Sequence, residues 1–341
     1  MAGKSTRDVR NLILKVMAES DGPVGGARIA EALRAAGVVL QPRSVRFHLL
    51  RLDADGFTRF ISRRQGRALT PEGRQELQRS DVMGKVGWVS SKVDALGYAM
   101  TFDPRRQCGT VVANVCILDA RDYARAMVHV VPVFQSGYSL GRIMGLAVGG
   151  ETFAGYSCPR GRTILAPVCS VSINGMLLKA GIPVTSRFGG LLEIRDRRPV
   201  RFVELIEYSG TSVDPLALFI RAGMTQVKAC AVSGTGLIGA SFREFPSAAL
   251  SGVRDVVRSL DTAGLQGVVA IGRPGLPLLG VPVTEGRTGL VVVGGLNPMA
   301  ALREEGIPME IRPLAGLDEF GRFRDVDDLA RLGRRRITYV E

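Results

Sequence analysis

The chain has 341 residues, of which 46% are hydrophobic, and its 45 Lys and Arg outnumber 32 Asp and Glu for a net charge of +13. This length allows two or three domains with proper cores, and an excess of positive charge is typical of proteins that bind nucleic acid. No apolar run approaches the roughly 18 residues of a membrane helix, no signal-peptide core is present, and the five cysteines contain no Cys-x-x-Cys pair. A membrane protein, a zinc site and a disulfide framework are therefore disfavoured, and we expect a cytoplasmic protein.

The first 80 residues carry more than half of the excess positive charge, because they hold 15 Lys and Arg against 8 Asp and Glu. Apolar residues at helical spacing predict three helices in this part, over residues 5–19, 27–36 and 42–56. Pro42 opens the third helix at the position where proline is tolerated. A small basic domain joined to a larger, nearly balanced one is the usual charge pattern of a nucleic-acid-binding protein with a second function.

The third helix and the stretch after it predict a surface that contacts DNA. Val45, Leu49 and Leu52 share one helix face, and the arginines point broadly the other way. Residues 57–69 read as a β-hairpin with an arginine-rich turn. Three helices followed by such a hairpin indicate a winged helix-turn-helix, which places one helix in the major groove. The predicted DNA contacts are Arg43, Ser44, Arg46, Phe47, Arg51, Arg63, Arg64 and Arg67.

A polar helix or linker over residues 74–84 follows, and we place the domain boundary between residues 81 and 82. In the second domain, residues 82–320, the pattern predicts strands at Val86–Ser90, Thr110–Leu118 and Val128–Phe134. Residues 119–126 read as a helix between the last two. Residues 234–239 have the spacing Gly-x-Gly-x-x-Gly, but no helix follows, so a hairpin turn is favoured over a dinucleotide site. Residues 321–341 read as a basic tail.

Two stretches of the second domain repeat one pattern. Residues 164–194 read as strand, short helix and strand, with Asn174 at the first joint and Gly-Ile-Pro at the second. Residues 290–320 repeat this order, with Asn297 lying 123 residues after Asn174. Such a period is far longer than that of a solenoid. The fold class predicted for the whole chain is therefore a winged helix-turn-helix followed by an internally duplicated, mixed α/β domain.

Several long stretches of the chain resemble one known family. They are SVRFHLLRLDADG, MTFDP, TVVANV, CSVSINGMLLKAGIPVTSRFGGLLEI, YSGTSVDPLALFIRAGMTQV, ASFREFP, LGVPV and GGLNPMAALREEGIP. Over about residues 5–320 the chain resembles the NrpR nitrogen-regulation repressors. The resemblance implies a homodimeric transcriptional repressor that binds a palindromic operator in double-stranded DNA and releases it when 2-oxoglutarate binds the effector domain. Some members carry two effector domains, so a second NrpR-type protein is a further candidate partner for this chain.

A dianionic keto acid such as 2-oxoglutarate is bound by arginine, hydroxyl and free backbone N–H groups. Polar residues at the strand ends of the second domain offer these groups, although packing or helix capping is an alternative explanation for each of them. The effector-binding candidates are Cys169, Ser170, Ser172, Asn174, Thr185, Ser186, Arg187, Ser209, Gly210, Thr211, Ser212, Asp214 and Arg243.

Two other functions compete with a ligand-responsive repressor. An enzyme acting on a small anionic metabolite would use the α/β domain, but the sequence contains no His-bearing motif, metal-spaced carboxylates or activated nucleophile, so no catalytic residue, metal ligand or cofactor is predicted. A winged-helix scaffold that binds proteins instead of DNA would show no salt-dependent binding to duplexes.

Overall fold

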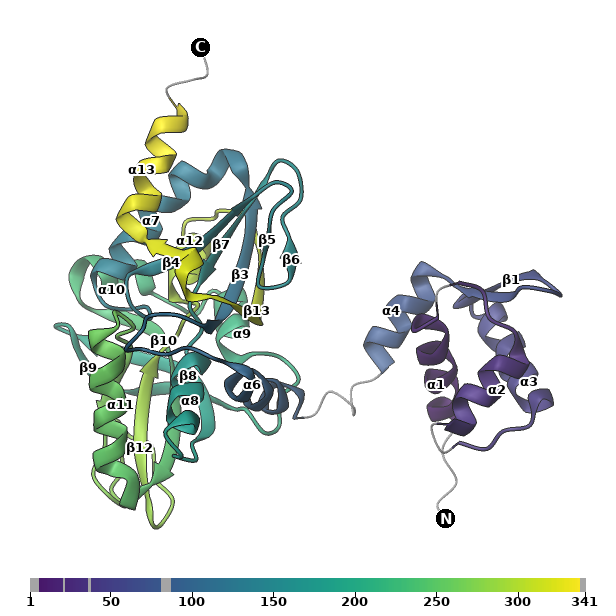
Figure 1. Ribbon diagram of the computed structural model, residues 1–341, viewed down its shortest axis with the longest axis horizontal. Helices are drawn as coiled ribbons and strands as arrows, with labels where there is room; N and C mark the ends of the chain where they lie inside the picture. The colour runs from purple at the N-terminus through teal and green to yellow at the C-terminus, as the bar shows by residue number, and fades with distance from the viewer. Residues whose placement is uncertain (1–5, 21, 36–37, 81–86, 338–341) are drawn as a thin grey trace. The chain divides into compact units, whose positions relative to one another are not determined.

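The computed structural model describes residues 6–20, 22–35, 38–80 and 87–337, and it contains two compact units, residues 1–85 and 86–341 (Figure 1). The predicted boundary between residues 81 and 82 lies outside the described residues. Each unit is described by itself.

The N-terminal unit has three helices, a two-stranded hairpin and a fourth helix. In chain order they are α1 (Thr6–Ala18), α2 (Gly26–Ala35), α3 (Pro42–Ala54), β1 (Thr58–Ser62), β2 (Gly66–Leu69) and α4 (Pro71–Ser80). Apolar side chains of α1, α2 and α3 are fully buried against one another, among them Ile13, Leu33 and Leu49. The hairpin is antiparallel, and Val24 pairs with Arg67 beside it. This order of elements is that of a winged helix-turn-helix.

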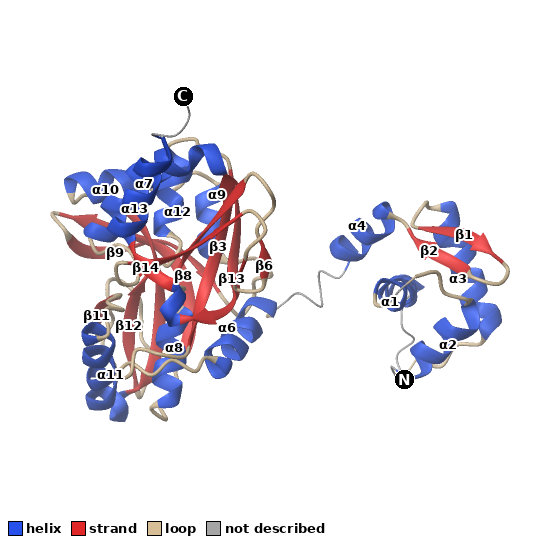
Figure 2. Cartoon of the chain, turned by 45° about the horizontal axis from the view of Figure 1, so that its top comes forward, coloured by secondary structure: helices blue, strands red, loops and turns tan. Residues whose placement is uncertain are grey.

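The C-terminal unit contains two five-stranded sheets with helices packed on them (Figure 2). Its first half consists of α6 (Trp88–Ala99), β3 (Thr110–Asp119), α7 (Tyr123–Gln135), β4 (Ile143–Val148), β5 (Thr152–Phe153), β6 (Tyr156–Ser157), β7 (Arg162–Pro167), α8 (Val171–Lys179), β8 (Thr185–Arg195) and β9 (Arg198–Glu207). Its second half consists of α9 (Pro215–Arg221), α10 (Val227–Ser233), β10 (Gly236–Pro246), α11 (Leu250–Thr262), β11 (Val268–Ile271), β12 (Arg287–Val293), α12 (Asn297–Glu304), β13 (Met309–Glu319), β14 (Phe323–Asp325) and α13 (Val326–Ile337).

Each half contributes two strands to the sheet of the other half. The strand order is β13-β3-β7-β4-β14 in one sheet and β11-β12-β10-β8-β9 in the other. Strand β8 of the first half therefore pairs with β10 of the second, and β13 of the second half pairs with β3 of the first. All pairings within both sheets are antiparallel. This reciprocal exchange joins the two halves in one core.

The duplication predicted from the sequence is present and is larger than predicted. Helices α7 and α11 occupy corresponding places and lie 127 residues apart, and β7 and β12 begin 125 residues apart. The pairing of Asn174 with Asn297 was wrong, however. Helix α8 begins at Val171, so Asn174 lies inside it, whereas Asn297 is the first residue of α12. The residue of α8 that corresponds to Asn297 is Ser172, 125 residues earlier, because Ser172 bonds the backbone of Val112 on β3 as Asn297 bonds that of Gly239 on β10.

Two predicted strands are helices. The predicted strand at residues 128–134 is the second part of α7, which also includes residues 123–126 of the helix predicted at 119–126. Residues Ala126, Met127, Val130, Val133 and Phe134 are all buried, and this 3–4 residue spacing belongs to one helix face. The predicted strand at residues 86–90 begins outside the described residues, and α6 starts at Trp88.

Two further predictions are corrected. The glycines at 234–239 form no hairpin turn, because Gly234 ends α10 with φ +78° and β10 begins at Gly236. Residues 323–337 of the predicted basic tail belong to the fold, since β14 pairs with β4 and α13 packs beside α7 (Figure 1). None of the described helices is long and apolar enough to cross a membrane.

Candidate functional site

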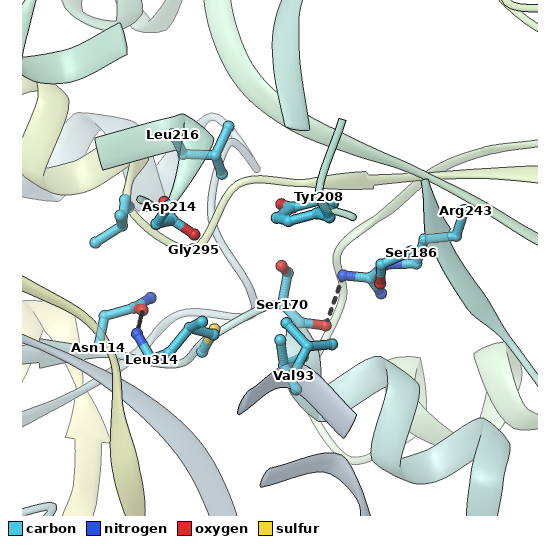
Figure 3. Close-up of a pocket in the computed structure, with 13 residues that line it drawn as sticks. Val93, Asn114, Ser170, Ser186, Tyr208, Asp214, Leu216, Arg243, Gly295 and Leu314 are labelled. Carbon is cyan, nitrogen blue, oxygen red and sulfur yellow. Dashed lines mark hydrogen bonds between the residues drawn. The ribbon is translucent and has the colours of Figure 1, made fainter. Parts of the chain in front are cut away.

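A small cavity lies where the two halves of the C-terminal unit meet (Figure 3). Its volume of about 20 Å³ is enough for about one water molecule. Residues from both halves form its wall: Val93, Asn114, Cys169, Ser170, Val171, Ser186, Tyr208, Asp214, Leu216, Arg243, Gly295, Leu296 and Leu314.

Two corresponding helices begin at this cavity. Ser170 is the N-cap residue of α8, Leu296 is the N-cap residue of α12, and both line the wall. The helix dipole makes each N-terminus favourable for negative charge, although first-turn N–H groups are already engaged: the Ser172 N–H donates to the Cys169 carbonyl oxygen, and the Asn297 N–H donates to the Gly294 carbonyl oxygen. The cavity is therefore a place where two such ends add their effects.

Arg243 is the only arginine in the cavity wall, and its side chain is 1% exposed. Strand β10 directs it inward, where Nη2 donates to the Ser170 carbonyl oxygen at 3.0 Å and to Ser241 Oγ at 3.2 Å. Its Nε and Nη1 have no hydrogen-bond partner in the part of the chain that the structure describes. Burial lowers the pKa of the guanidinium to about 10, so it remains charged at neutral pH.

Leaving a buried donor without a partner costs about 1–3 kcal/mol, and more when the group is charged. Arg243 is buried, charged and incompletely hydrogen-bonded, and the oxygens that it contacts are neutral. Such an arrangement is stabilised by an anion that accepts from Nε and Nη1, because arginine offers carboxylates two parallel donors. The chemistry of the site is therefore that of an anion-binding pocket.

The remaining polar groups of the wall are neutral or become neutral easily. Burial raises the pKa of Cys169 to about 12 and raises that of Tyr208 further, so both keep their protons at neutral pH. Asp214 is 8% exposed, and burial raises the pKa of its carboxyl group. Its Oδ1 accepts from the Ala217 N–H at 2.9 Å and so caps α9.

The structure brings together five of the predicted effector-binding residues, which are Cys169, Ser170, Ser186, Asp214 and Arg243. Asn174 lies next to the cavity, where its Nδ2 donates to Ser186 Oγ at 2.9 Å. Ser172 is used for packing, because its Oγ accepts from the Val112 N–H at 3.0 Å.

Arg187 and Thr185 lie apart from the cavity wall. Arg187 Nη1 contacts Glu244 Oε1 at 2.6 Å, and Glu244 follows Arg243 on β10. Successive strand residues point to opposite faces, so the partner of Arg187 points away from the cavity. Thr185 Oγ1 accepts from Arg287 Nη2 at 3.1 Å in the same cluster.

The hydroxyl-rich turn at Ser209, Gly210, Thr211 and Ser212 also lies outside the wall. Thr211 Oγ1 donates to the Val213 carbonyl oxygen at 2.7 Å, which is a local turn contact. The residues on either side of this turn, Tyr208 and Asp214, do line the cavity.

Sequence reasoning missed Asn114, Tyr208 and Gly295. Asn114 is a buried polar residue within the apolar strand β3, and its Oδ1 accepts from the Leu314 N–H at 3.1 Å. The sequence did contain a signal for Asn114, which is an amide inside an otherwise apolar strand. Because buried polar groups require partners, such a residue indicates a polar contact within the core.

A second candidate surface lies on the N-terminal unit. On α3, Arg43, Arg46, Phe47 and Arg51 are exposed, and the Arg51 guanidinium lies 4.6 Å from the centre of the Phe47 ring. The helix thus buries its apolar side and presents a basic and aromatic side. Among the other predicted contacts, Ser44 is half-buried and Arg63 and Arg64 are exposed in the turn of the hairpin.

Arg67 differs from these arginines. Its Nε contacts Asp53 Oδ2 at 2.6 Å, and Asp53 Oδ1 also accepts from Thr58 Oγ1 at 2.6 Å. This contact fixes the hairpin to α3, so Arg67 has a structural partner within the domain. Arg59 of β1 is exposed and was not among the predicted contacts.

Comparison with known proteins agrees with the division of the chain into an N-terminal and a C-terminal unit. Residues 86–325 match the family model of the NrpR regulatory domains NRD1 and 2, and residues 11–77 match the winged-helix domain of ribonuclease R. The chain is 34% identical to the global nitrogen regulator NrpRI of Methanosarcina mazei, over 92% of this chain and 96% of that protein.

Two other proteins match this chain over part of one of the two lengths. The chain is 30% identical to the global nitrogen regulator NrpR of Methanococcus maripaludis over 88% of its residues, but it spans only 52% of that protein. The crystal structure of a nitrogen repressor-like protein from Methanococcus jannaschii is similar with a TM-score of 0.58 and 25% identity, covering 69% of this chain and 97% of that one.

Proposed function

Because this chain belongs to the NrpR family, we propose that it is a transcriptional repressor of nitrogen-assimilation genes that binds operator DNA through its winged helix and releases it when 2-oxoglutarate binds. We propose further that it acts as a homodimer on a palindromic operator. Two recognition helices about 34 Å apart would then contact successive major grooves.

The DNA-binding part of the proposal is supported by the exposed face of α3 and the turn of the hairpin. Arg43, Arg46, Arg51, Arg63 and Arg64 are exposed. Each phosphate that such a residue neutralises contributes a slope of about −0.9 to the dependence of log affinity on log salt. Five such contacts would give a slope of about −4.5 per protomer by the same rule.

The effector part of the proposal rests on one observation, which is the charged and incompletely paired Arg243 at the cavity. The cavity is too small for a five-carbon dicarboxylate in its present form, so effector binding requires a wall to move. A ligand that binds only the opened form shifts the protein toward that form. The coupling between effector and DNA is expected to be about 1–3 kcal/mol, or roughly 5- to 150-fold in affinity.

The experiment that tests the proposal measures binding of the purified chain to its own promoter fragment at two salt concentrations, with and without millimolar 2-oxoglutarate. We expect salt-sensitive binding that the keto acid weakens. Binding that does not respond to 2-oxoglutarate would keep the DNA-binding role and reject this effector. No binding at either salt concentration would favour the scaffold function.

A further inference from the structure

Two ionisable groups of opposite kind line the cavity without pairing with each other. Arg243 contacts only neutral oxygens, and Asp214 accepts from backbone N–H groups of α9. Both are more than nine-tenths buried. Among the described residues, no salt bridge engages either of them.

A dianionic effector creates a charge problem in this cavity. Arg243 supplies one positive charge, whereas the effector brings two negative charges to a wall that already contains the Asp214 carboxyl group. When two carboxylates share a site of low polarity, the pKa of one of them is raised strongly. An ionised Asp214 would therefore oppose the second carboxylate of the effector.

We propose that Asp214 binds the effector as a neutral carboxylic acid that donates its proton in a hydrogen bond, so that each effector bound takes up one proton from solvent. This proposal rests on the proposed function, because it concerns a dianionic effector. Oδ1 of Asp214 remains the cap of α9, and the acidic proton lies on the other oxygen. The step moves a proton from solvent to Asp214, and it breaks no covalent bond of the effector.

The other groups around Asp214 do not supply this proton change. Tyr208 and Cys169 keep their protons at neutral pH because burial raises their pKa values. Arg243 stays positive, because its lowered pKa of about 10 is still well above neutral pH. Lys92 of α6 lies outside the cavity wall, where its ammonium group is 4.8 Å from the centre of the Trp88 ring.

The expected pH dependence follows from these charges. Burial already raises the pKa of Asp214 in the empty cavity, and the bound dianion raises it further. Protonation of Asp214 thus favours effector binding. The affinity for the effector increases as pH falls, by at most tenfold per pH unit, and levels off below the pKa that Asp214 has without bound effector. An amino acid effector would behave in the opposite way, because its ammonium group would pair with an ionised Asp214.

The test uses the full chain and calorimetric titration with 2-oxoglutarate between pH 6.5 and 8.5, in two buffers with different heats of ionisation. The variant Asp214→Asn keeps an oxygen for the α9 cap and cannot ionise. For the wild-type chain we expect tighter binding at lower pH and uptake of up to one proton per effector at pH 8.5. For D214N we expect binding at pH 8.5 at least as tight as wild type, with no proton uptake and no pH dependence.

The outcomes separate the two proposals. Absence of 2-oxoglutarate binding by the wild-type chain at every pH would overturn the proposed effector. Wild-type binding that is independent of pH, or a tenfold or larger loss of affinity in D214N, would overturn the role of Asp214 while keeping the effector. Thermal unfolding of D214N checks its fold, and Asp214→Ser, which also caps without charge, replaces it if D214N is unfolded.

Discussion

Gly175 of α8 packs directly against Gly97 of α6: a Cβ added at Gly175 would come within 2.8 Å of the Gly97 carbonyl oxygen and within 2.7 Å of Met100 Cε. This close contact holds α6 beside the cavity, because Val93 of α6 forms part of the cavity wall. The Ser209 carbonyl oxygen lies 3.7 Å from the position of a Cβ on Gly87, just before α6. Helix α6 thus contacts both the cavity and the turn beside it.

Gly175→Ala is expected to push α6 away from α8. Overpacking of this kind costs typically 1–3 kcal/mol, so the free energy of unfolding should fall by about that amount. Urea denaturation measures it. Gly321→Ala is the matched control, since a Cβ there meets nothing within 4 Å, and it should change stability little. Equal stability of G175A and wild type would mean that α6 is not tightly held.

Arg243→Met is expected to leave the free energy of unfolding within about 1 kcal/mol of wild type, or to raise it, because it replaces a buried, poorly paired charge by an apolar chain of similar length. At the same time the increase in melting temperature caused by 2-oxoglutarate should disappear. Differential scanning calorimetry with and without the keto acid measures both quantities.

The control for this experiment is Arg187→Ala. Arg187 is paired with Glu244, so its removal should lower stability and leave effector affinity unchanged. A strongly destabilised R243M that still responds to 2-oxoglutarate would instead make Arg243 a structural residue.

Asn297→Ala is expected to lower the free energy of unfolding by about 2–4 kcal/mol, since it leaves several buried backbone groups without partners. Asn297 Oδ1 accepts from the Gly239 N–H at 2.8 Å, and its Nδ2 donates to the carbonyl oxygens of Gly239 and Tyr138, each at 3.0 Å. Asn174→Ala should cost less, because Asn174 bonds only the Ser186 hydroxyl and its Oδ1 has no partner among the described residues. Similar losses in the two variants, measured in urea, would contradict this difference.

Arg64→Ala should weaken DNA binding and reduce the salt slope by about 0.9 if Arg64 neutralises one phosphate. Arg67→Ala should act on the fold, because it leaves Asp53 without its arginine partner. We expect a loss of about 1–3 kcal/mol in the stability of the winged helix. Fluorescence anisotropy with a labelled duplex measures the effect on DNA binding, and thermal unfolding measures the effect on stability. An R67A variant with wild-type stability and a reduced slope would place Arg67 at the DNA.

The sequence predicted the winged helix well because every element there has its own local signal, such as Pro42 at the start of α3 and the arginine-rich turn of the hairpin. It failed at residues 128–134, where a run of β-branched residues suggested a strand. The burial of Val130 and Val133 on one face of α7 outweighed that propensity.

The site was predicted in part for a similar reason. Polar residues at strand ends identified Ser170, Asp214 and Arg243, but the sequence could not separate Arg243 from Arg187. Which of them faces the cavity depends on the register of β8 against β10, and this register contains an irregularity between Phe242 and Arg243. The residues of neither strand alone predict where such a register shift occurs.

The reciprocal exchange of β8 and β13 resembles the arrangement of a domain-swapped dimer whose two chains have become one. In a dimer of identical chains, corresponding positions around the twofold axis must carry the same residue. A single chain is free of that restriction, and the two halves differ at the cavity: Arg243 of β10 lines it, whereas Cys116, 127 residues earlier on β3, does not. A symmetric pair would line the cavity with two copies of each group, whereas this wall combines the arginine of Arg243 with the carboxyl group of Asp214. A framework of two similar halves therefore surrounds a cavity whose wall is not symmetric in charge.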